Sequence, residues 1–226
     1  MLGDLHGANI PLEQVLKKSN FNKDLDNLIF IGDLADRWPE PHLCLQTLLS
    51  CKNLIPILGN HDLFIKKWIN RGVIDPRWVR FGGLDTLEHL DKYKDLLLEY
   101  FDKAKYYHLL DDNKFFCHGG FNHKRVITKQ KKLTFAINRQ MFKTAIKYEK
   151  QKLKFKPIFN NENIIKIKEI FIGHTPTRNY HPAFKSNVIN VDTGAGNGGK
   201  LTLMDVYSKK YIQGTHSSKC YETLLK

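Results

Sequence analysis

The stretch Leu28-Ile29-Phe30-Ile31-Gly32-Asp33-Leu34-Ala35-Asp36-Arg37 joins four consecutive apolar residues to a turn that carries two acids and an arginine. A short apolar run that ends at a turn signal predicts a strand with buried faces. The glycine after the run lets the following loop approach a ligand closely. The stretch therefore predicts a buried strand that delivers polar side chains to the loop at its carboxyl end.

The same arrangement is repeated along the chain. Further strands are predicted at residues 54–58, 114–117, 170–172 and 188–191. They lead into Gly59-Asn60-His61-Asp62, His118-Gly119-Gly120, Gly173-His174-Thr175-Pro176 and Asp192-Thr193-Gly194. Ligands bind at the carboxyl ends of strands in layered α/β sheets, so these five strand ends predict one shared site. The intervening sequence predicts helices at 11–18, 41–50 and 91–105, and a hairpin of 201–206 with 210–213.

A related stretch, Gly3-Asp4-Leu5-His6-Gly7, lies close to the start of the chain. Asp4 and His6 project from one tight loop, and the flanking glycines allow that loop to approach a metal or ligand closely. Only Met1 and Leu2 precede the loop, so its supporting strand is nearly missing. We therefore expect the first strand of the fold to be truncated.

The composition is that of an ordinary globular chain, with 226 residues of which 42% are hydrophobic and 26% charged. This length suffices for one large α/β domain, and we expect a single domain over residues 1–226. No run approaches the roughly 18 apolar residues of a membrane span, and no secretory signal is recognisable. The four cysteines lack CxxC spacing, which favours buried thiols and a cytoplasmic location.

The formal net charge of +13 is concentrated in one segment. Twelve Lys or Arg residues lie between Lys124 and Lys156, against the single acid Glu149. Such a segment either guides an anionic substrate or nucleic acid electrostatically, or forms a solvated, Lys-rich helical face. Both interpretations stay open, and we expect a Lys-rich helical insertion around residues 121–165.

Taken in order, GDLHG, GDLADR, GNHD, a strand ending in His with two glycines, and GHTP resemble the motifs of the calcineurin-like metallophosphoesterases. The resemblance covers nearly the whole chain and implies an α/β fold, a layered β-sheet sandwich flanked by helices. Within that superfamily, WVRFGGLDTLEHL (residues 78–90), FIGHTPT and VDTGAGNGG are most similar to bacterial phosphoprotein phosphatases. Their relatives include Ser/Thr protein phosphatases and symmetrical dinucleoside-tetraphosphate hydrolases.

The resemblance also implies a site for two divalent metal ions. Asp33 matches the ligand that bridges both ions. The other matched ligands are Asp4 and His6 for the first ion, and Asn60, His118 and His174 for the second. Nitrogen and oxygen ligands without thiolate favour Mn²⁺, with Fe or Zn²⁺ as alternatives. Two such ions, about 3.5–4 Å apart, clamp the attacking oxygen and the phosphoryl oxygens during in-line displacement.

Four further residues match catalytic positions of the family. His61 would protonate the leaving oxygen, and Asp36 would orient it. Arg37 would bind phosphate through the N–H donors of its planar guanidinium group. A second phosphate-binding arginine is expected between the last two metal histidines, where FAINRQMF resembles the segment of bacterial members. We therefore prefer Arg139 to Arg125, which lies within the Lys-rich run.

These features predict an enzyme that hydrolyses phosphate monoesters by direct attack of a metal-bridging hydroxide. A serine/threonine protein phosphatase is the first choice, with phosphorylated proteins or small phosphoesters as substrates. Trp38-Pro39 departs from the glycine that usually follows Asp-Arg, and Asp62 is shared with the tetraphosphate hydrolases. The alternative is therefore a symmetrical dinucleoside-tetraphosphate hydrolase. A more distant alternative is a non-catalytic module that binds nucleic acid or a partner through the basic segment.

Overall fold

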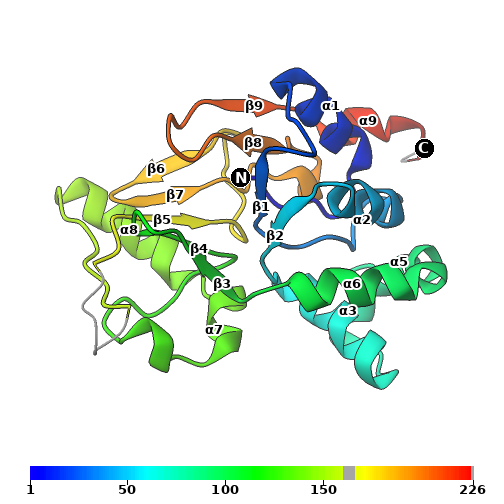
Figure 1. The fold of residues 1–226 in the computed structure, drawn as a ribbon, viewed down its shortest axis with the longest axis horizontal. Helices are drawn as coiled ribbons and strands as arrows, with labels where there is room; N and C mark the ends of the chain where they lie inside the picture. Colours follow the sequence, from blue (N-terminus) through cyan, green and yellow to red (C-terminus); the bar gives the residue numbers. More distant parts are fainter. Residues whose placement is uncertain (160–165, 225–226) are drawn as a thin grey trace.

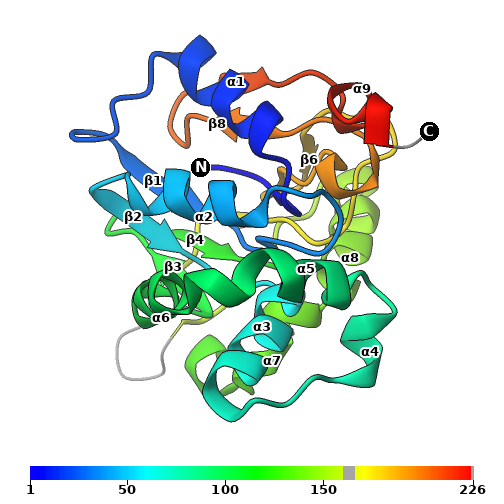
Figure 2. The same cartoon turned by 90° about the vertical axis from the view of Figure 1, so that its right-hand side faces the viewer.

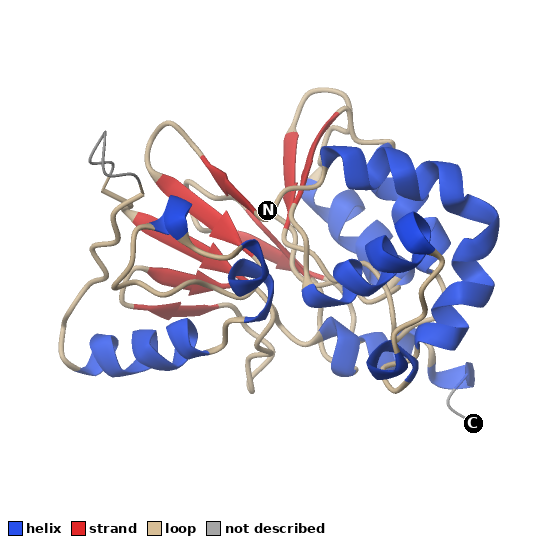
Figure 3. Ribbon diagram, turned by 90° about the horizontal axis from the view of Figure 1, so that it is seen from below, coloured by secondary structure: helices blue, strands red, loops and turns tan. Residues whose placement is uncertain are grey.

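The computed structural model describes residues 1–159 and 166–224. Two sheets lie face to face in the middle of the molecule, and helices cover their outer faces (Figure 1 and Figure 3). This order of helices, sheet, sheet and helices is the layered α/β sandwich predicted from the sequence. Among the described residues, none of the helices is long and apolar enough to cross a bilayer.

The larger sheet has the strand order β3-β4-β5-β7-β6. Its strands are β3 (Tyr107–Leu109), β4 (Lys114–Cys117), β5 (Glu169–Ile172), β7 (Val188–Asn190) and β6 (Ala183–Lys185). The three central strands β4, β5 and β7 are parallel, while β3 and β6 pair with them in antiparallel fashion. The loops that follow the parallel strands therefore leave the sheet at one edge.

The smaller sheet consists of two strand pairs joined by the N-terminal residues. The pairs are the parallel β1 (Asn27–Phe30) with β2 (Asn53–Pro56), and the antiparallel β8 (Thr202–Met204) with β9 (Tyr211–Gln213). Leu2 lies between the pairs, in a parallel bridge to Phe30 and an antiparallel bridge to Leu203. Its amide donates to the Ile29 carbonyl at 2.8 Å, and the Ile31 amide donates to the Leu2 carbonyl at 3.0 Å. The expected shortened first strand is thus a single bridge in the middle of this sheet.

The central strands β1, β4, β5 and β7 are apolar on both faces because both faces are buried. In β1, Leu28 and Phe30 pack against helices, whereas Ile29 faces the other sheet. Phe116 and Phe171 stack between the sheets with ring centroids 4.7 Å apart. The cluster between the sheets contains Met1, Ile29, Ile31, Ile57, Phe116, Phe171, Ile189, Val191 and Met204. Burial on both faces explains why these strands read as continuous apolar runs.

Helices from two parts of the chain cover the outer faces. The helices on the side of the smaller sheet share one core with it, and they are α1 (Asn9–Ser19), α2 (Pro41–Leu49), α3 (Asn60–Arg71), α4 (Pro76–Val79), α5 (Gly83–Leu90) and α6 (Lys94–Lys103). This helical face turns toward the viewer in Figure 2. The larger sheet is covered by α7 (Lys132–Ile137) and α8 (Gln140–Lys150). The remaining short elements are α9 (Ser217–Cys220), η1 (Asp91–Tyr93), η2 (Ile127–Lys129), η3 (Ala195–Asn197) and η4 (Glu222–Leu224).

Several boundaries differ from the sequence-based prediction. The helix expected at 91–105 begins as η1 and ends at Lys103. Lys105 instead pairs with the chain after β2: its amide donates to the Pro56 carbonyl, and its carbonyl accepts from Leu58. The edge strands β3 and β6 were not predicted, because they are only partly buried and lack a continuous apolar run. Residues 160–165 of the expected insertion lie outside the described residues.

Candidate metal centre

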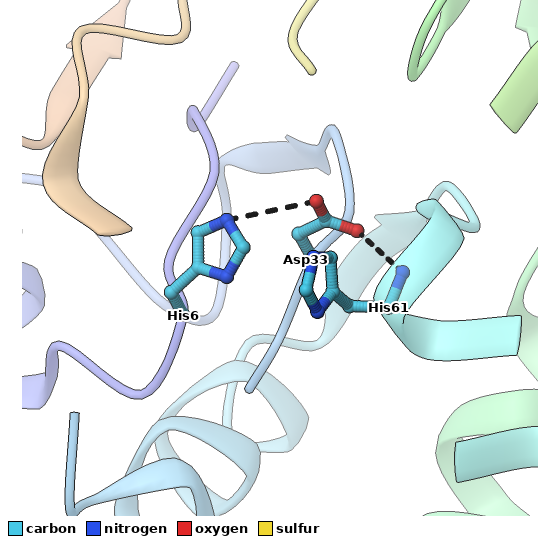
Figure 4. Close-up of side chains that lie close together, drawn as sticks. All are labelled: His6, Asp33 and His61. Atoms are coloured by element: carbon cyan, nitrogen blue, oxygen red, sulfur yellow. Dashed lines mark hydrogen bonds and ion pairs between the residues drawn. The ribbon is translucent and has the colours of Figure 1, made fainter. Parts of the chain in front are cut away.

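Asp33 lies where two groups of potential metal ligands meet. One group contains His6, Asp33 and His61, and the other contains Asp33, His118 and His174. Within each group the ligand atoms lie within 4.8 Å of one another. The Asp33 Oδ2 atom is 3.6 Å from His6 Nε2 and 3.2 Å from His118 Nε2. Figure 4 shows the three side chains close together, with the His6 ring paired to one carboxylate oxygen of Asp33 and the His61 backbone amide donating to the other. One carboxylate is therefore shared by both groups.

Asp4 and Asn60 lie beside these groups and carry buried oxygen atoms. The Asp4 Oδ2 atom accepts a hydrogen bond from the His174 amide at 3.0 Å. Within the described residues, Asp4 Oδ1 and Asn60 Oδ1 are buried without a hydrogen-bond partner. Leaving a buried acceptor unpaired is unfavourable, and a cation bound next to each atom would satisfy it. This set of carboxylate, amide and imidazole donors fits divalent ions such as Mn²⁺, Fe²⁺ or Zn²⁺.

The histidines around Asp33 are electrostatically coupled to it. Burial favours a high pKa for Asp33, but the charges of His118 and His61 outweigh it and hold that pKa well below its usual value. Burial alone would lower the pKa of His118, yet the charge of Asp33 raises it to about 10. The pKa of His6 is lowered by burial to about 4, and that of His174 to about 3. Because metal ligands must be deprotonated, cation binding would release the proton from His118.

His61 forms a hydrogen-bonded pair with Asp36. Its Nδ1 atom lies 2.6 Å from Asp36 Oδ2. Burial lowers the pKa of His61, but the charges of Asp33 and Asp36 outweigh this effect and raise it overall. Because Nδ1 is bound to a carboxylate, Nε2 is the nitrogen left to face a substrate. The structure thus brings together the two residues expected to act as acid and orienting group.

Asp36 is itself held by two donors that the sequence interpretation missed. Its Oδ1 atom accepts hydrogen bonds from Trp78 Nε1 at 2.8 Å and from Thr86 Oγ1 at 2.6 Å. Gly82 has a φ of +95°, and a Cβ there would lie 2.8 Å from the Asp36 carbonyl oxygen. The segment of residues 78–86 therefore packs directly on the Asp36 loop and fixes the orientation of the carboxylate.

Replacing Thr86 by valine is expected to lower the free energy of unfolding by about 1.5–3 kcal/mol, because a buried hydrogen bond to a charged group is lost. The turnover number should fall as well, since Asp36 loses one of the donors that orient it. Denaturant unfolding and steady-state kinetics measure the two effects. Thr128→Val, at an exposed position, is the matched control. Unchanged unfolding of Thr86→Val would contradict the assigned role of the hydroxyl group.

Two further buried acids organise the site. Asp62 accepts hydrogen bonds from the amides of Asp33 at 2.9 Å, Leu34 at 2.9 Å and Gly59 at 2.8 Å. It thereby ties the Asp33 loop to the start of α3. Asp192 follows β7, and its charge adds to the effect of burial in raising the pKa of Asp4. Asp62 lies in GNHD and Asp192 in VDTGAGNGG. The sequence motifs do not indicate that Asp62 joins two loops or that Asp192 acts on the pKa of Asp4, because both effects depend on burial and on contacts in the fold.

The arginines approach the site from two sides. Arg37 follows Asp36, and its Cζ atom lies 6.0 Å from the centroid of the Phe81 ring. Arg139 precedes α8, close enough that its charge contributes to lowering the pKa of His174. Arg125 lies in the turn before η2, where its carbonyl accepts a hydrogen bond from the Gln130 side chain. Of the two alternatives for the second arginine, Arg139 is therefore the one whose charge acts on a proposed metal ligand, His174.

Comparison with known proteins places these observations in context. The family model described as calcineurin-like phosphoesterase matches residues 1–214. The asymmetrical bis(5'-nucleosyl)-tetraphosphatase PrpE of Bacillus cereus (strain Q1) is 25% identical over 224 residues, covering 89% of this chain and 87% of that protein.

Solved structures share the fold. A protein provisionally described as a diadenosine tetraphosphatase superposes with a TM-score of 0.63 at 18% identity, covering 94% of this chain and 90% of that one. A protein serine/threonine phosphatase from Saccharomyces cerevisiae gives a TM-score of 0.58 at 14% identity, covering 95% of this chain and 78% of that one. At these identities the likeness concerns the fold alone.

Proposed function

Since the chain belongs to the calcineurin-like phosphoesterase family, we propose that it hydrolyses dinucleoside tetraphosphates with the help of two divalent ions, Mn²⁺ in the first instance. The observation that carries the proposal is the carboxylate of Asp33, which lies close to the proposed ligand His6 of one group and to His118 and His174 of the other. A shared carboxylate between two sets of ligands suits a two-metal phosphoesterase. The family makes the chain a hydrolytic enzyme, so a purely non-catalytic binding module is no longer a candidate.

Nucleotide substrates are preferred here to phosphoproteins, which reverses the order derived from the sequence. The tetraphosphatase PrpE aligns over 89% of this chain, so the likeness is not confined to the metal-ligand motifs. A phosphoserine or phosphothreonine phosphatase is the second candidate. It is favoured by the His61–Asp36 pair, because an alkoxide leaving group needs a proton more than a departing nucleotide does.

Each residue of the site has a distinct part in the proposed reaction. When bound, the two ions would activate water and neutralise charge on the phosphoryl group. Asp33 would hold both ions. His61 would donate a proton from Nε2 to the leaving oxygen, while Asp36 keeps the imidazole in the required tautomer. Arg37 and Arg139 would bind phosphate oxygens through their planar guanidinium groups.

Chelation should abolish activity, and added Mn²⁺ should restore it, because water activation depends on the ions. With the reconstituted protein, diadenosine tetraphosphate should be cleaved with a kcat/KM at least about tenfold above that for a phosphoserine peptide. Chromatography of the products distinguishes symmetrical cleavage to two ADP from asymmetrical cleavage to ATP and AMP. Full activity after exhaustive chelation would overturn the metal mechanism, whereas a preference for the peptide would favour the second candidate.

A further inference from the structure

A cavity of about 480 Å³ opens beside the His61–Asp36 pair, and its size lies in the usual range of small-molecule sites. Asp36 forms part of its lining, together with Arg37, Trp38, Phe81, Asp85 and His89. The Phe81 ring lies 5.5 Å from the His61 ring, between centroids. The cavity therefore lies directly beside the His61–Asp36 pair, with Asp36 and Phe81 in its wall.

The cavity presents aromatic rings whose positions are fixed by their neighbours. Phe81 is 40% exposed although it is a large apolar side chain. The following residue, Gly82, packs against the backbone of Asp36 and so holds the Phe81 turn on the loop of the catalytic pair. On another wall, Trp38 stacks on Tyr221 with centroids 5.0 Å apart and donates from Nε1 to the Ala195 carbonyl at 2.8 Å. Rigid aromatic faces of this kind suit a flat, stacking ligand.

The third wall is also built from stacked rings. His89 stacks on His42 with centroids 5.6 Å apart and an interplanar angle of 13°. His42 stacks in turn on Tyr93 at 5.4 Å. The stacked rings of His42 and Tyr93 hold the His89 side chain in place. The wall of the cavity on α5 is therefore fixed by packing, as is the wall on the Asp36 loop.

The charges in the cavity favour one orientation of the ligand. Arg37 supplies donors to a phosphate group on the side of the catalytic pair. Asp85 supplies only acceptor atoms when ionised, and its charge repels a further phosphate. An anionic group is therefore disfavoured next to Asp85, whereas a group that carries hydrogen-bond donors is favoured. A ribose with two hydroxyl groups, or a base with an exocyclic amine, meets this requirement.

We infer that this cavity binds the nucleoside of the substrate, with the base stacked on Phe81, donors of the nucleoside bound by Asp85, and the adjoining phosphate bound by Arg37. The inference rests on the proposed function, because it names the part of a dinucleoside tetraphosphate that this cavity recognises. It assigns substrate preference to the turn around Phe81, which lies outside the metal-ligand loops.

The test isolates the base from the phosphate by comparing two inhibitors of p-nitrophenyl phosphate hydrolysis. AMP and ribose 5-phosphate share the sugar and the phosphate, and only AMP carries a base. The wild-type protein should bind AMP roughly 10- to 100-fold more tightly, as expected for one stacked base. Phe81→Leu should reduce this ratio of inhibition constants to about one, because an aliphatic side chain offers no ring face.

Matched variants separate stacking from general damage. Phe184→Leu makes the same change at another exposed phenylalanine, which is 42% exposed on β6, and should keep the wild-type ratio. Asp85→Asn replaces one acceptor oxygen by an NH2 donor. It should weaken inhibition by AMP while the ring of Phe81 is kept, and unchanged inhibition by AMP would contradict the proposed contact of Asp85 with the nucleoside. Asp85→Asn also tests the cavity independently if Phe81→Leu fails to fold.

The outcomes keep this inference distinct from the proposed function. A wild-type ratio near one, or a high ratio that Phe81→Leu leaves intact, would overturn the nucleoside cavity even if diadenosine tetraphosphate is cleaved. A high ratio that Phe81→Leu abolishes would support the cavity. If that result came with no cleavage of diadenosine tetraphosphate, the protein would bind nucleosides at this cavity while the proposed substrate would be wrong.

Discussion

Asp33→Asn is expected to lower turnover of any phosphoester by more than about 10³-fold, because the ions that stabilise charge in the transition state lose their shared ligand. The metal content should fall at the same time. Asparagine has the shape of aspartate and can still accept the hydrogen bond from the His61 amide, which is 2.9 Å long in the structure. The fold should therefore survive, and the loss should be chemical. Metal analysis by mass spectrometry and single-turnover kinetics measure both effects.

Asp102→Asn is the matched control for this experiment, because Asp102 is an exposed aspartate on α6. It should leave metal content and turnover at wild-type values. Thermal unfolding of both variants checks that they are folded. If Asp33→Asn retained the full metal content and near-normal turnover, the shared-ligand assignment of Asp33 would be refuted.

His61→Asn is expected to slow hydrolysis of phenyl phosphate by roughly 10²–10⁴-fold, the usual contribution of a general acid. Hydrolysis of p-nitrophenyl phosphate should slow far less, because nitrophenolate departs with little help from a proton. The comparison depends only on the leaving group and applies whichever natural substrate is correct. Rates measured across a series of aryl phosphates would show a steeper dependence on leaving-group basicity in the variant than in the wild type.

The paired control is Asp36→Asn, which should show the same bias more weakly, since Asp36 acts through His61. Metal content should be retained in both variants, because neither residue is proposed as a ligand. Equal losses on good and poor leaving groups, with chemistry shown to be rate-limiting, would exclude His61 as the leaving-group acid and indicate a positioning role.

Much of the site could be predicted because its residues follow buried strands directly in the sequence. Asp33 comes three residues after the end of β1, and His118 comes directly after β4. The partners of Asp36 could not be found in this way. Trp78 and Thr86 are 42 and 50 residues away along the chain, and only the packing of α4 and α5 brings them to Asp36. Trp78 is fully buried, and its indole also donates this hydrogen bond.

The composition of the basic segment, residues 124–156, does not decide between electrostatic guidance of an anion and a solvated helical face. In α8, Met141, Phe142 and Ala145 are buried against the larger sheet, while Lys143 and Lys147 are exposed. This is the pattern of a helix with one apolar face and one solvated, charged face. Packing thus accounts for the apolar residues of α8, and electrostatic guidance of an anionic substrate stays a prediction for its lysines.

Four residues of the metal centre have left-handed backbone conformations: φ is 52° at His6, 59° at Asp33, 86° at Asp36 and 65° at His174. Residues other than glycine adopt this backbone conformation at a cost of about 1–3 kcal/mol each. Glycine would relax the backbone at each position, but it would also remove a proposed metal ligand or the proposed orienting group. Mutations that improve stability and mutations that preserve catalysis are therefore opposed at these four positions. Selection for stability alone would favour glycine at these positions, whereas selection for turnover would favour the aspartate and histidine residues that are present.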